Sequence, residues 1–202
     1  MDKPVFLIAK VHPGDLNAMV KNSMAQMPDT DDPNEVVRRI NSGEWVVRKA
    51  DLLKQVTTVS VDGVKRFCAK DSLKEANVGW TSDNFDKLFL NKTEEGVPAA
   101  TIAVHNLERD SLDAPIMSEL GDRTEIQLVH FFDLLKRQSK GEESCLLING
   151  RANIAYIRGT DGNFWAVNAF WNSVNGFWCV DACSVANPGG WDAGGRVLSC
   201  DS

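Results

Sequence analysis

The stretch FWAVNAFWNSVNGFWCVDACSV, residues 164–185, predicts two antiparallel strands joined by a short loop. Successive side chains of a strand point to opposite faces of its sheet, so alternate residues form two separate sets. If residues 173–176 form the loop, the tryptophan, valine and alanine side chains of the two strands lie opposite one another. These cross-strand pairs are Trp171 with Trp178, Ala169 with Val180, and Val167 with Ala182. The stretch therefore predicts a hairpin with one continuous apolar face that belongs to a hydrophobic core.

The other face of this hairpin mixes aromatic, thiol, amide and carboxylate groups. The same register pairs Asn172 with Phe177, Phe170 with Cys179, and Asn168 with Asp181. Neither a buried face nor a solvated one has this pattern, because binary patterning places similar residues together. One interpretation is a binding surface, and the alternative is a second core layer in which another element covers the two phenylalanines.

The C-terminal segment also has an unusual composition. Residues 166–202 contain no lysine, glutamate, glutamine or methionine, whereas residues 1–165 contain 12 lysines, 10 glutamates, 4 glutamines and 5 methionines. Strands and glycine-rich turns disfavour lysine and glutamate, which is one explanation. The other is genetic, since codons that end in C or T encode none of these four residues.

Residues 165–200 resemble the variable proteins of diversity-generating retroelements, in which adenines of a template are copied inaccurately and asparagine codons become other codons ending in C or T. The resemblance rests on a Trp/Val/Ala/Gly framework interleaved with asparagine and residues derivable from it, ending in WDAGGRVLSC, residues 191–200. It implies a C-type lectin fold of the formylglycine-generating-enzyme type, on which variable residues bind diverse ligands.

The resemblance also implies which positions vary and which stay fixed. The candidate variable, ligand-binding positions are Asn168, Phe170, Asn172, Val174, Asn175, Phe177, Cys179, Asp181, Cys183, Asn187, Gly189, Gly190, Asp192, Gly195 and Cys200. The framework positions are Trp165, Trp171, Trp178, Val180, Ala182, Trp191 and Arg196. A solvent-facing patch on rigid strands tolerates such change, whereas a packed core does not. The two phenylalanines would then be aromatic anchors beside adaptable polar contacts.

Helical and strand patterns before this segment predict an α+β fold in which helices support a sheet-rich C-terminal half. Helices are expected over residues 31–43, 81–90 and 124–141, and strands over 57–64 and 99–107. Asp31 or Asp32 caps the first helix, and Thr124 the last. Asn149-Gly150 and GTDGN, residues 159–163, are further hairpin signals. We expect an N-terminal extension, residues 1–30, integrated with one C-type lectin-like domain, residues 31–202, whose diversified segment spans about 166–202.

Charge and cysteine content narrow the class of function. A net charge of −6 opposes phosphate-backbone binding, so we expect no nucleic acid partner. The N-terminus has no signal-peptide core and the chain no apolar span, so we expect no membrane insertion and, by default, a cytoplasmic protein. Five cysteines cannot all be paired, which makes reduced thiols the expectation. Cys179 and Cys183 would lie about 13 Å apart on a strand, so we expect no metal and no cofactor.

The sequence thus predicts a non-enzymatic protein whose diversified C-terminal surface recognises varied targets. Its partner would be a protein or another macromolecule, and a monomer is favoured. The alternatives are a conventional protein–protein interaction domain with a fixed partner, and an oxidase similar to the formylglycine-generating enzymes.

Overall fold

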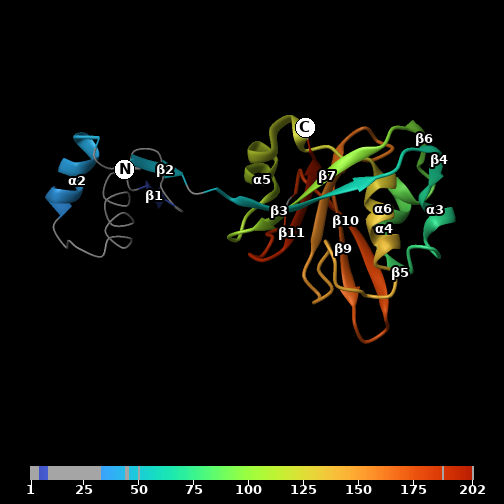
Figure 1. Ribbon diagram of the computed structural model, residues 1–202. Helices are drawn as coiled ribbons and strands as arrows, with labels where there is room; N and C mark the ends of the chain where they lie inside the picture. Colours follow the sequence, from blue (N-terminus) through green and yellow to red (C-terminus); the bar gives the residue numbers. More distant parts are fainter. Residues whose placement is uncertain (1–4, 9–32, 44–45, 50, 188, 202) are drawn as a thin grey trace. The chain divides into compact units, whose positions relative to one another are not determined.

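The fold is described from a computed structural model that covers residues 5–8, 33–43, 46–49, 51–187 and 189–201. The chain divides into two compact units, Met1–Asp51 and Leu52–Ser202 (Figure 1). None of the helices in these residues is long and apolar enough to cross a membrane.

In the first unit, strand β1 (Val5–Ile8) pairs in parallel with β2 (Val46–Lys49), and helix α2 (Pro33–Asn41) lies between them in sequence. The helix predicted over residues 31–43 is confirmed. Gly43 follows its end with a φ of +69°, a conformation that glycine adopts without strain. The two candidate capping residues, Asp31 and Asp32, lie outside the described residues, as does most of the predicted extension over residues 1–30.

The second unit is built on one large mixed sheet, and the predicted α+β class is confirmed. Its strand order is β3-β7-β11-β8-β9-β10-β5. These strands are β3 (Leu53–Val61), β5 (Val78–Thr81), β7 (Ala100–Leu107), β8 (Asn153–Arg158), β9 (Phe164–Asn172), β10 (Phe177–Ser184) and β11 (Arg196–Cys200). The C-terminal strand β11 lies between β7, to which it is antiparallel, and β8, to which it is parallel. A separate antiparallel pair joins β4 (Val64–Cys68) to β6 (Thr93–Val97).

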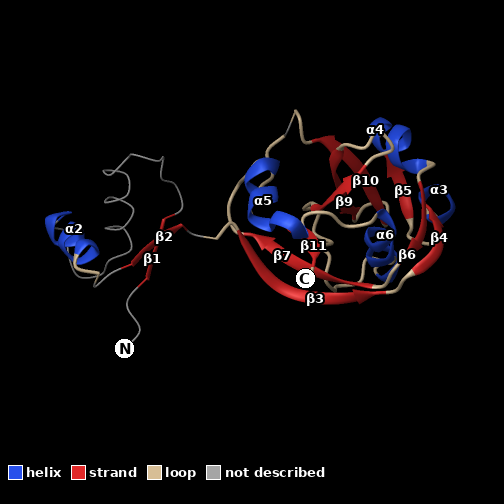
Figure 2. Ribbon diagram, turned by 90° about the horizontal axis from the view of Figure 1, so that it is seen from above, coloured by secondary structure: helices blue, strands red, loops and turns tan. Residues whose placement is uncertain are grey.

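Helices cover the two faces of the sheet. Helix α6 (Leu128–Arg137) lies inside the curl of the sheet and α5 (Asp113–Leu120) on its other side (Figure 2). We call the side of α6 the inner face and the side of α5 the outer face. A large core on the inner face joins α6 and the β4–β6 pair to the sheet. A smaller core under α5 lies on the outer face.

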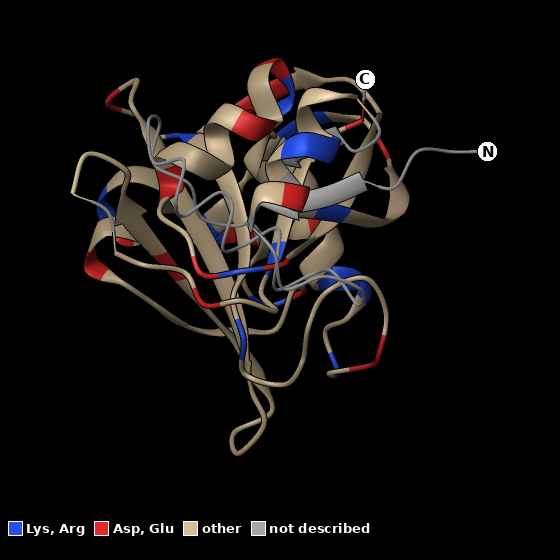
Figure 3. Cartoon of the chain, turned by 90° about the vertical axis from the view of Figure 1, so that its left-hand side faces the viewer, with Lys and Arg blue, Asp and Glu red and all other residues tan. Residues whose placement is uncertain are grey.

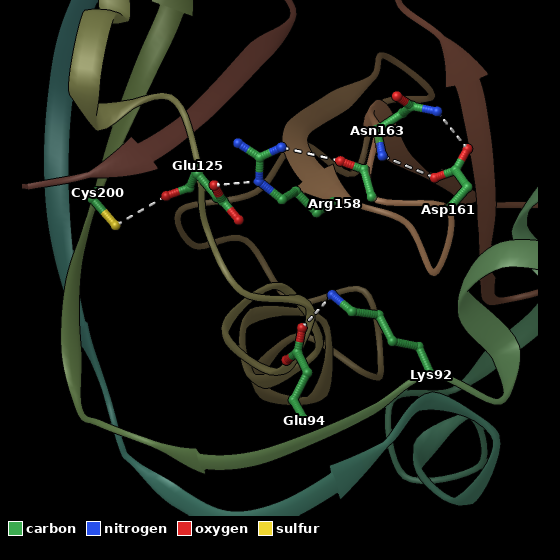
Figure 4. A network of polar contacts seen from close by, with 8 residues as sticks. Lys92, Glu94, Glu125, Arg158, Asp161, Asn163 and Cys200 are labelled. Carbon is green, nitrogen blue, oxygen red and sulfur yellow. Dashed lines mark hydrogen bonds and ion pairs between the residues drawn. The ribbon is translucent and has the colours of Figure 1, made fainter.

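The predicted helix over residues 124–141 begins later than expected. Thr124 does not cap it, because its hydroxyl donates to the carbonyl oxygens of Met117 and Gly121 instead. The backbone amides of Leu128 and Val129 donate to the Glu94 carboxylate at 3.0 and 2.9 Å, so a residue from β6 satisfies the first turn. Figure 4 shows this carboxylate beside the Lys92 ammonium, 2.7 Å away.

The remaining elements agree with the sequence prediction in part, and the strand predicted over residues 57–64 ends at Val61. The helix predicted over residues 81–90 forms as α4 (Asp83–Phe85), capped by Ser82, and continues as a π-helical turn, η1 (Asp86–Leu90). A short helix, α3 (Ala69–Ser72), and a 3₁₀ turn, η2 (Gly121–Arg123), complete the unit. Sequence reasoning missed α5 and the short strands β1, β2, β4, β5 and β6. Asn149-Gly150 forms a bend before β8 and does not join two paired strands.

Candidate ligand-binding face

The β9–β10 hairpin has the register that the sequence predicted. Trp171 pairs with Trp178, Ala169 with Val180 and Val167 with Ala182, and the three pairs of the other face are also as expected. The segment GTDGN likewise joins β8 to β9 as an antiparallel hairpin. The length of the loop and the alternation of residue types along the strands therefore determine the face of the sheet on which each side chain lies.

The inner face of this hairpin is closed by packing. All six Trp, Val and Ala side chains of the three pairs are buried in the large core. The Trp171 and Trp178 rings meet edge to face with centroids 5.2 Å apart, and the Trp178 indole donates to the Gln138 carbonyl at the end of α6. A Cβ at Gly141 would collide with the Trp171 ring, so the turn after α6 also fits this face closely.

The outer face has two parts. Toward the start of β9 and the end of β10, Phe164, Ala166 and Cys183 belong to the smaller core with α5. Toward the hairpin loop, Phe170 and Phe177 belong to neither core and are half-buried. The second-core interpretation therefore holds for one end of the face and not for the two phenylalanines on which it was based.

The structure distributes the fifteen candidate positions unevenly. The exposed ones are Val174, Asn175, Asn187, Gly189, Gly190 and Asp192. The half-buried ones are Phe170, Asn172, Phe177, Asp181, Cys183 and Cys200, and the buried ones are Asn168, Cys179 and Gly195. Val174, at the hairpin tip, is 91% exposed. The prediction that these positions lie on a solvent-facing surface is therefore wrong for the three buried residues.

Some of the less exposed candidates have structural contacts that explain their position. The Asn172 side-chain oxygen accepts the backbone amides of Val174 and Asn175, which closes the hairpin loop. Gly195 lies against the Ala152 carbonyl, 3.3 Å from where a Cβ would stand. The Asn168 amide donates to the Cys183 sulfur at 3.8 Å, between β9 and β10.

Cys200 does not lie on the outer face. It packs against the large inner core, and its thiol donates to the Glu125 carbonyl oxygen at 3.2 Å (Figure 4). The Glu125 carboxylate accepts from Arg158 at 3.0 Å, so this corner of the sheet is occupied by structural contacts. The structure therefore separates Cys200 from the other candidate positions.

The segment between β10 and β11 borders a cavity of about 520 Å³ on the same side as α5. Its lining includes three candidate positions and residues around the start of β8, namely Asn149, Gly150, Arg151, Ala152, Ile154, Gly190, Trp191, Asp192 and Gly195. A Cβ at Gly189 or Gly190 would meet no atom within 4 Å, and neither has a positive φ. Other side chains therefore fit at these two positions without strain.

The backbone of this segment is held by residues that precede it in the chain. Trp191 exchanges two backbone hydrogen bonds with Ser111, and the Ala193 amide donates to the Asp110 carboxylate at 2.8 Å. The Arg151 guanidinium donates to the Ala193 carbonyl. None of these contacts uses the Asp192 side chain, so position 192 can change without removing them.

A buried carboxylate orients the tryptophan of the cavity. Oδ1 of Asp113 accepts hydrogen bonds from the Trp191 indole at 2.7 Å and from the Tyr156 hydroxyl at 2.9 Å. Burial, followed by the Asp113 charge, raises the pKa of Tyr156, so the phenol stays a donor. Sequence reasoning missed Asp113, since nothing in its neighbourhood connects it with a tryptophan far along the chain.

The thiols of the outer face are poor nucleophiles. Burial, and then the Asp181 carboxylate, raises the pKa of Cys183 to about 11. Burial also raises the pKa of Cys179. Both sulfurs are therefore protonated at neutral pH, and the thiolate is the reactive form. All five cysteines are free of disulfides.

A possible nucleophile and base also occur together beneath α5. Nε2 of His105 lies 2.9 Å from the Ser199 hydroxyl, but both residues are buried. Burial, and then the Arg123 charge, lowers the pKa of His105. A substrate cannot reach this pair, so the two side chains form a buried hydrogen bond within the core.

The chief residue that sequence reasoning missed on the outer face is Trp80 of β5. Trp80 pairs with Cys179 of β10, which in turn pairs with Phe170 of β9, so the three residues form a row across the sheet. The Trp80 side chain is 48% exposed. The only sequence signal was an isolated tryptophan in a short strand, VGWT, which by itself does not predict a surface position.

No family model matches the chain, and searches of curated proteins and of solved structures each find no match.

Proposed function

We propose that this chain is a non-enzymatic binding protein of C-type lectin-like fold whose outer face and adjoining loops are diversified to recognise varied targets, as in the variable proteins of diversity-generating retroelements. The observation that carries the proposal is the separation of the two faces of β9 and β10. Framework residues fill the inner face, while most positions derivable from asparagine lie on the outer face or in exposed loops.

The loop before β11 supports the same function. Asp110 and Ser111 hold its backbone, and Asp113 holds the Trp191 side chain. All three residues lie outside the diversified segment. Side chains at Gly190 and Asp192 border the cavity but are not needed for these contacts. A binding site of this kind can change its lining while the supporting structure stays the same.

Charge is consistent with a ligand that is not a polyanion. The hairpin tip has no acidic or basic side chain, and Figure 3 shows this loop without charged residues at the bottom of the view. Along β9 and β10 the charged residue of the outer face is Asp181. Aromatic rings beside amides are typical of evolved protein-binding surfaces.

Two libraries of codons ending in C or T test the proposed division. The first varies outer positions Phe170, Phe177, Asn187, Gly190 and Asp192, and the matched control varies inner positions Val167, Ala169, Val180 and Ala182. Protease resistance of displayed variants measures the folded fraction. We expect most outer variants and few inner variants to fold. Equal losses in both libraries would contradict the proposal.

The genomic DNA tests the mechanism of diversification. We expect a near-identical copy of the segment encoding residues 166–202 close to the gene, differing from it at adenines, and a reverse transcriptase gene beside it. If both are absent, the conventional interaction domain with a fixed partner becomes the better account.

A further inference from the structure

We infer that the ligand surface has a fixed part, Trp80, and that it fits folded protein partners that present an apolar side chain next to a basic group. The inference rests on the proposed function and extends the surface beyond the diversified segment. Trp80 lies far from residues 166–202 in sequence, so mutation of that segment leaves it unchanged.

The placement of Trp80 follows from an irregularity at the edge of the sheet. Val78 pairs with Trp178, but the next pair is Trp80 with Cys179, so Gly79 is an extra residue in β5. Such bulges occur at sheet edges and re-aim a side chain. The strand is held in place by the Trp178 amide, which donates to the Asn77 carbonyl at 2.9 Å.

Gly79 brings Trp80 next to a candidate variable residue. A Cβ at Gly79 would collide with the Phe177 ring, so this ring packs directly on the glycine backbone. Phe177 and Trp80 are therefore neighbours on the outer face. With Phe170 two strands away, they form an aromatic patch of which one member is fixed and two are diversified.

The chemistry of the patch favours a protein partner. Tryptophan is enriched among the residues that dominate binding energy near the centre of protein interfaces, and it supplies a large apolar area with few rotatable bonds. β5, β9 and β10, the strands that carry the patch, have no basic residue, which opposes phosphate-bearing partners, and their one carboxylate on this face is Asp181. An apolar side chain beside a lysine or arginine complements this arrangement.

Selection of variants that bind purified proteins tests the inference. Libraries varying Phe170, Phe177 and Asp181 are built with Trp80 and with Trp80→Ala, and both are selected on lysozyme and on ribonuclease A, two basic folded proteins. We expect binders mainly from the Trp80 library. In each binder, Trp80→Ala should weaken Kd by at least about tenfold, whereas Trp80→Phe should retain most of the affinity.

A matched control separates contact from general damage to the sheet. Val56, 45% exposed on the opposite edge strand β3, is changed to alanine in the same binders and should leave Kd unchanged. Equal numbers and affinities of binders from both libraries would overturn the role of Trp80 but leave the proposed function intact. Failure of both libraries would overturn the proposed function together with this inference. Trp80-dependent retention on chitin or amylose beads, without protein binders, would overturn the protein assignment.

Discussion

The inner and outer faces of the β9–β10 hairpin share one backbone but differ in what covers them. On the inner face, Trp171 and Trp178 are enclosed by α6 and the turn that follows it. On the outer face, α5 covers the end that carries Phe164 and Cys183 and leaves Phe170 half-buried. One strand can therefore have a buried face at which few substitutions are expected to be tolerated and an open face at which many are.

The comparison also indicates that exposure alone does not decide which substitutions the fold tolerates. Asn172 lies on the open part of the outer face, yet its side chain closes the hairpin loop. Asp192 is exposed in the loop before β11, and none of the hydrogen bonds that hold that loop uses its side chain. Tolerance to substitution thus depends on whether the fold uses the side chain or only the main chain.

The largest expected effect is on the inner face. Trp178→Ala should lower the free energy of unfolding by about 3 to 5 kcal/mol, the usual range for deleting a large buried aromatic ring. Phe177→Asn, one residue away on the outer face, should cost about 1 kcal/mol or less, because the ring is half-buried. Chemical denaturation of both variants measures the difference. Equal destabilisation would mean that both faces are core.

A smaller effect is expected at the carboxylate that supports the outer loop. Asp113→Ala leaves the Trp191 and Tyr156 donors unpaired and should cost about 2 to 4 kcal/mol. Asp113→Asn should cost less, since Oδ1 accepts both bonds and Oδ2 has no hydrogen-bond partner among the described residues. For both variants, denaturation curves measure the loss of stability. The chemical shift of the Trp191 indole proton in NMR spectra reports whether its hydrogen bond is kept. If Asp113→Ala left that indole signal unshifted, its role as the anchor would be wrong.

The smallest effect concerns the part of the outer face that α5 covers. Burial lowers the pKa of His105, so below its ordinary value of 6.5 the unfolded chain binds a proton that the folded protein does not. Stability should therefore be unaffected by this group above pH 6.5 and fall as the pH decreases toward the lowered pKa, by at most about 1.4 kcal/mol per pH unit. Unfolding midpoints between pH 7.5 and 5 measure the slope. His105→Gln serves as the comparison and should give a flatter profile, whereas an identical slope would assign the effect to other groups.

Local sequence determined the hairpin and its inner face. Alternation over residues 164–183 and a four-residue loop are sufficient to fix the register, because a slip by one residue would turn every tryptophan toward the other side. Helix α2 was likewise predictable from Pro33 and Gly43, which lie at or next to its two ends.

Tertiary structure decided the rest, since it depends on contacts between residues far apart in sequence. Glu94, not Thr124, sets where α6 begins, and α5 decides which end of the outer face is covered. Trp80 reaches the candidate surface only because β5 pairs with β10 across a bulge. Periodicity identifies two faces of a strand, but which neighbour covers each face is a property of the packed chain.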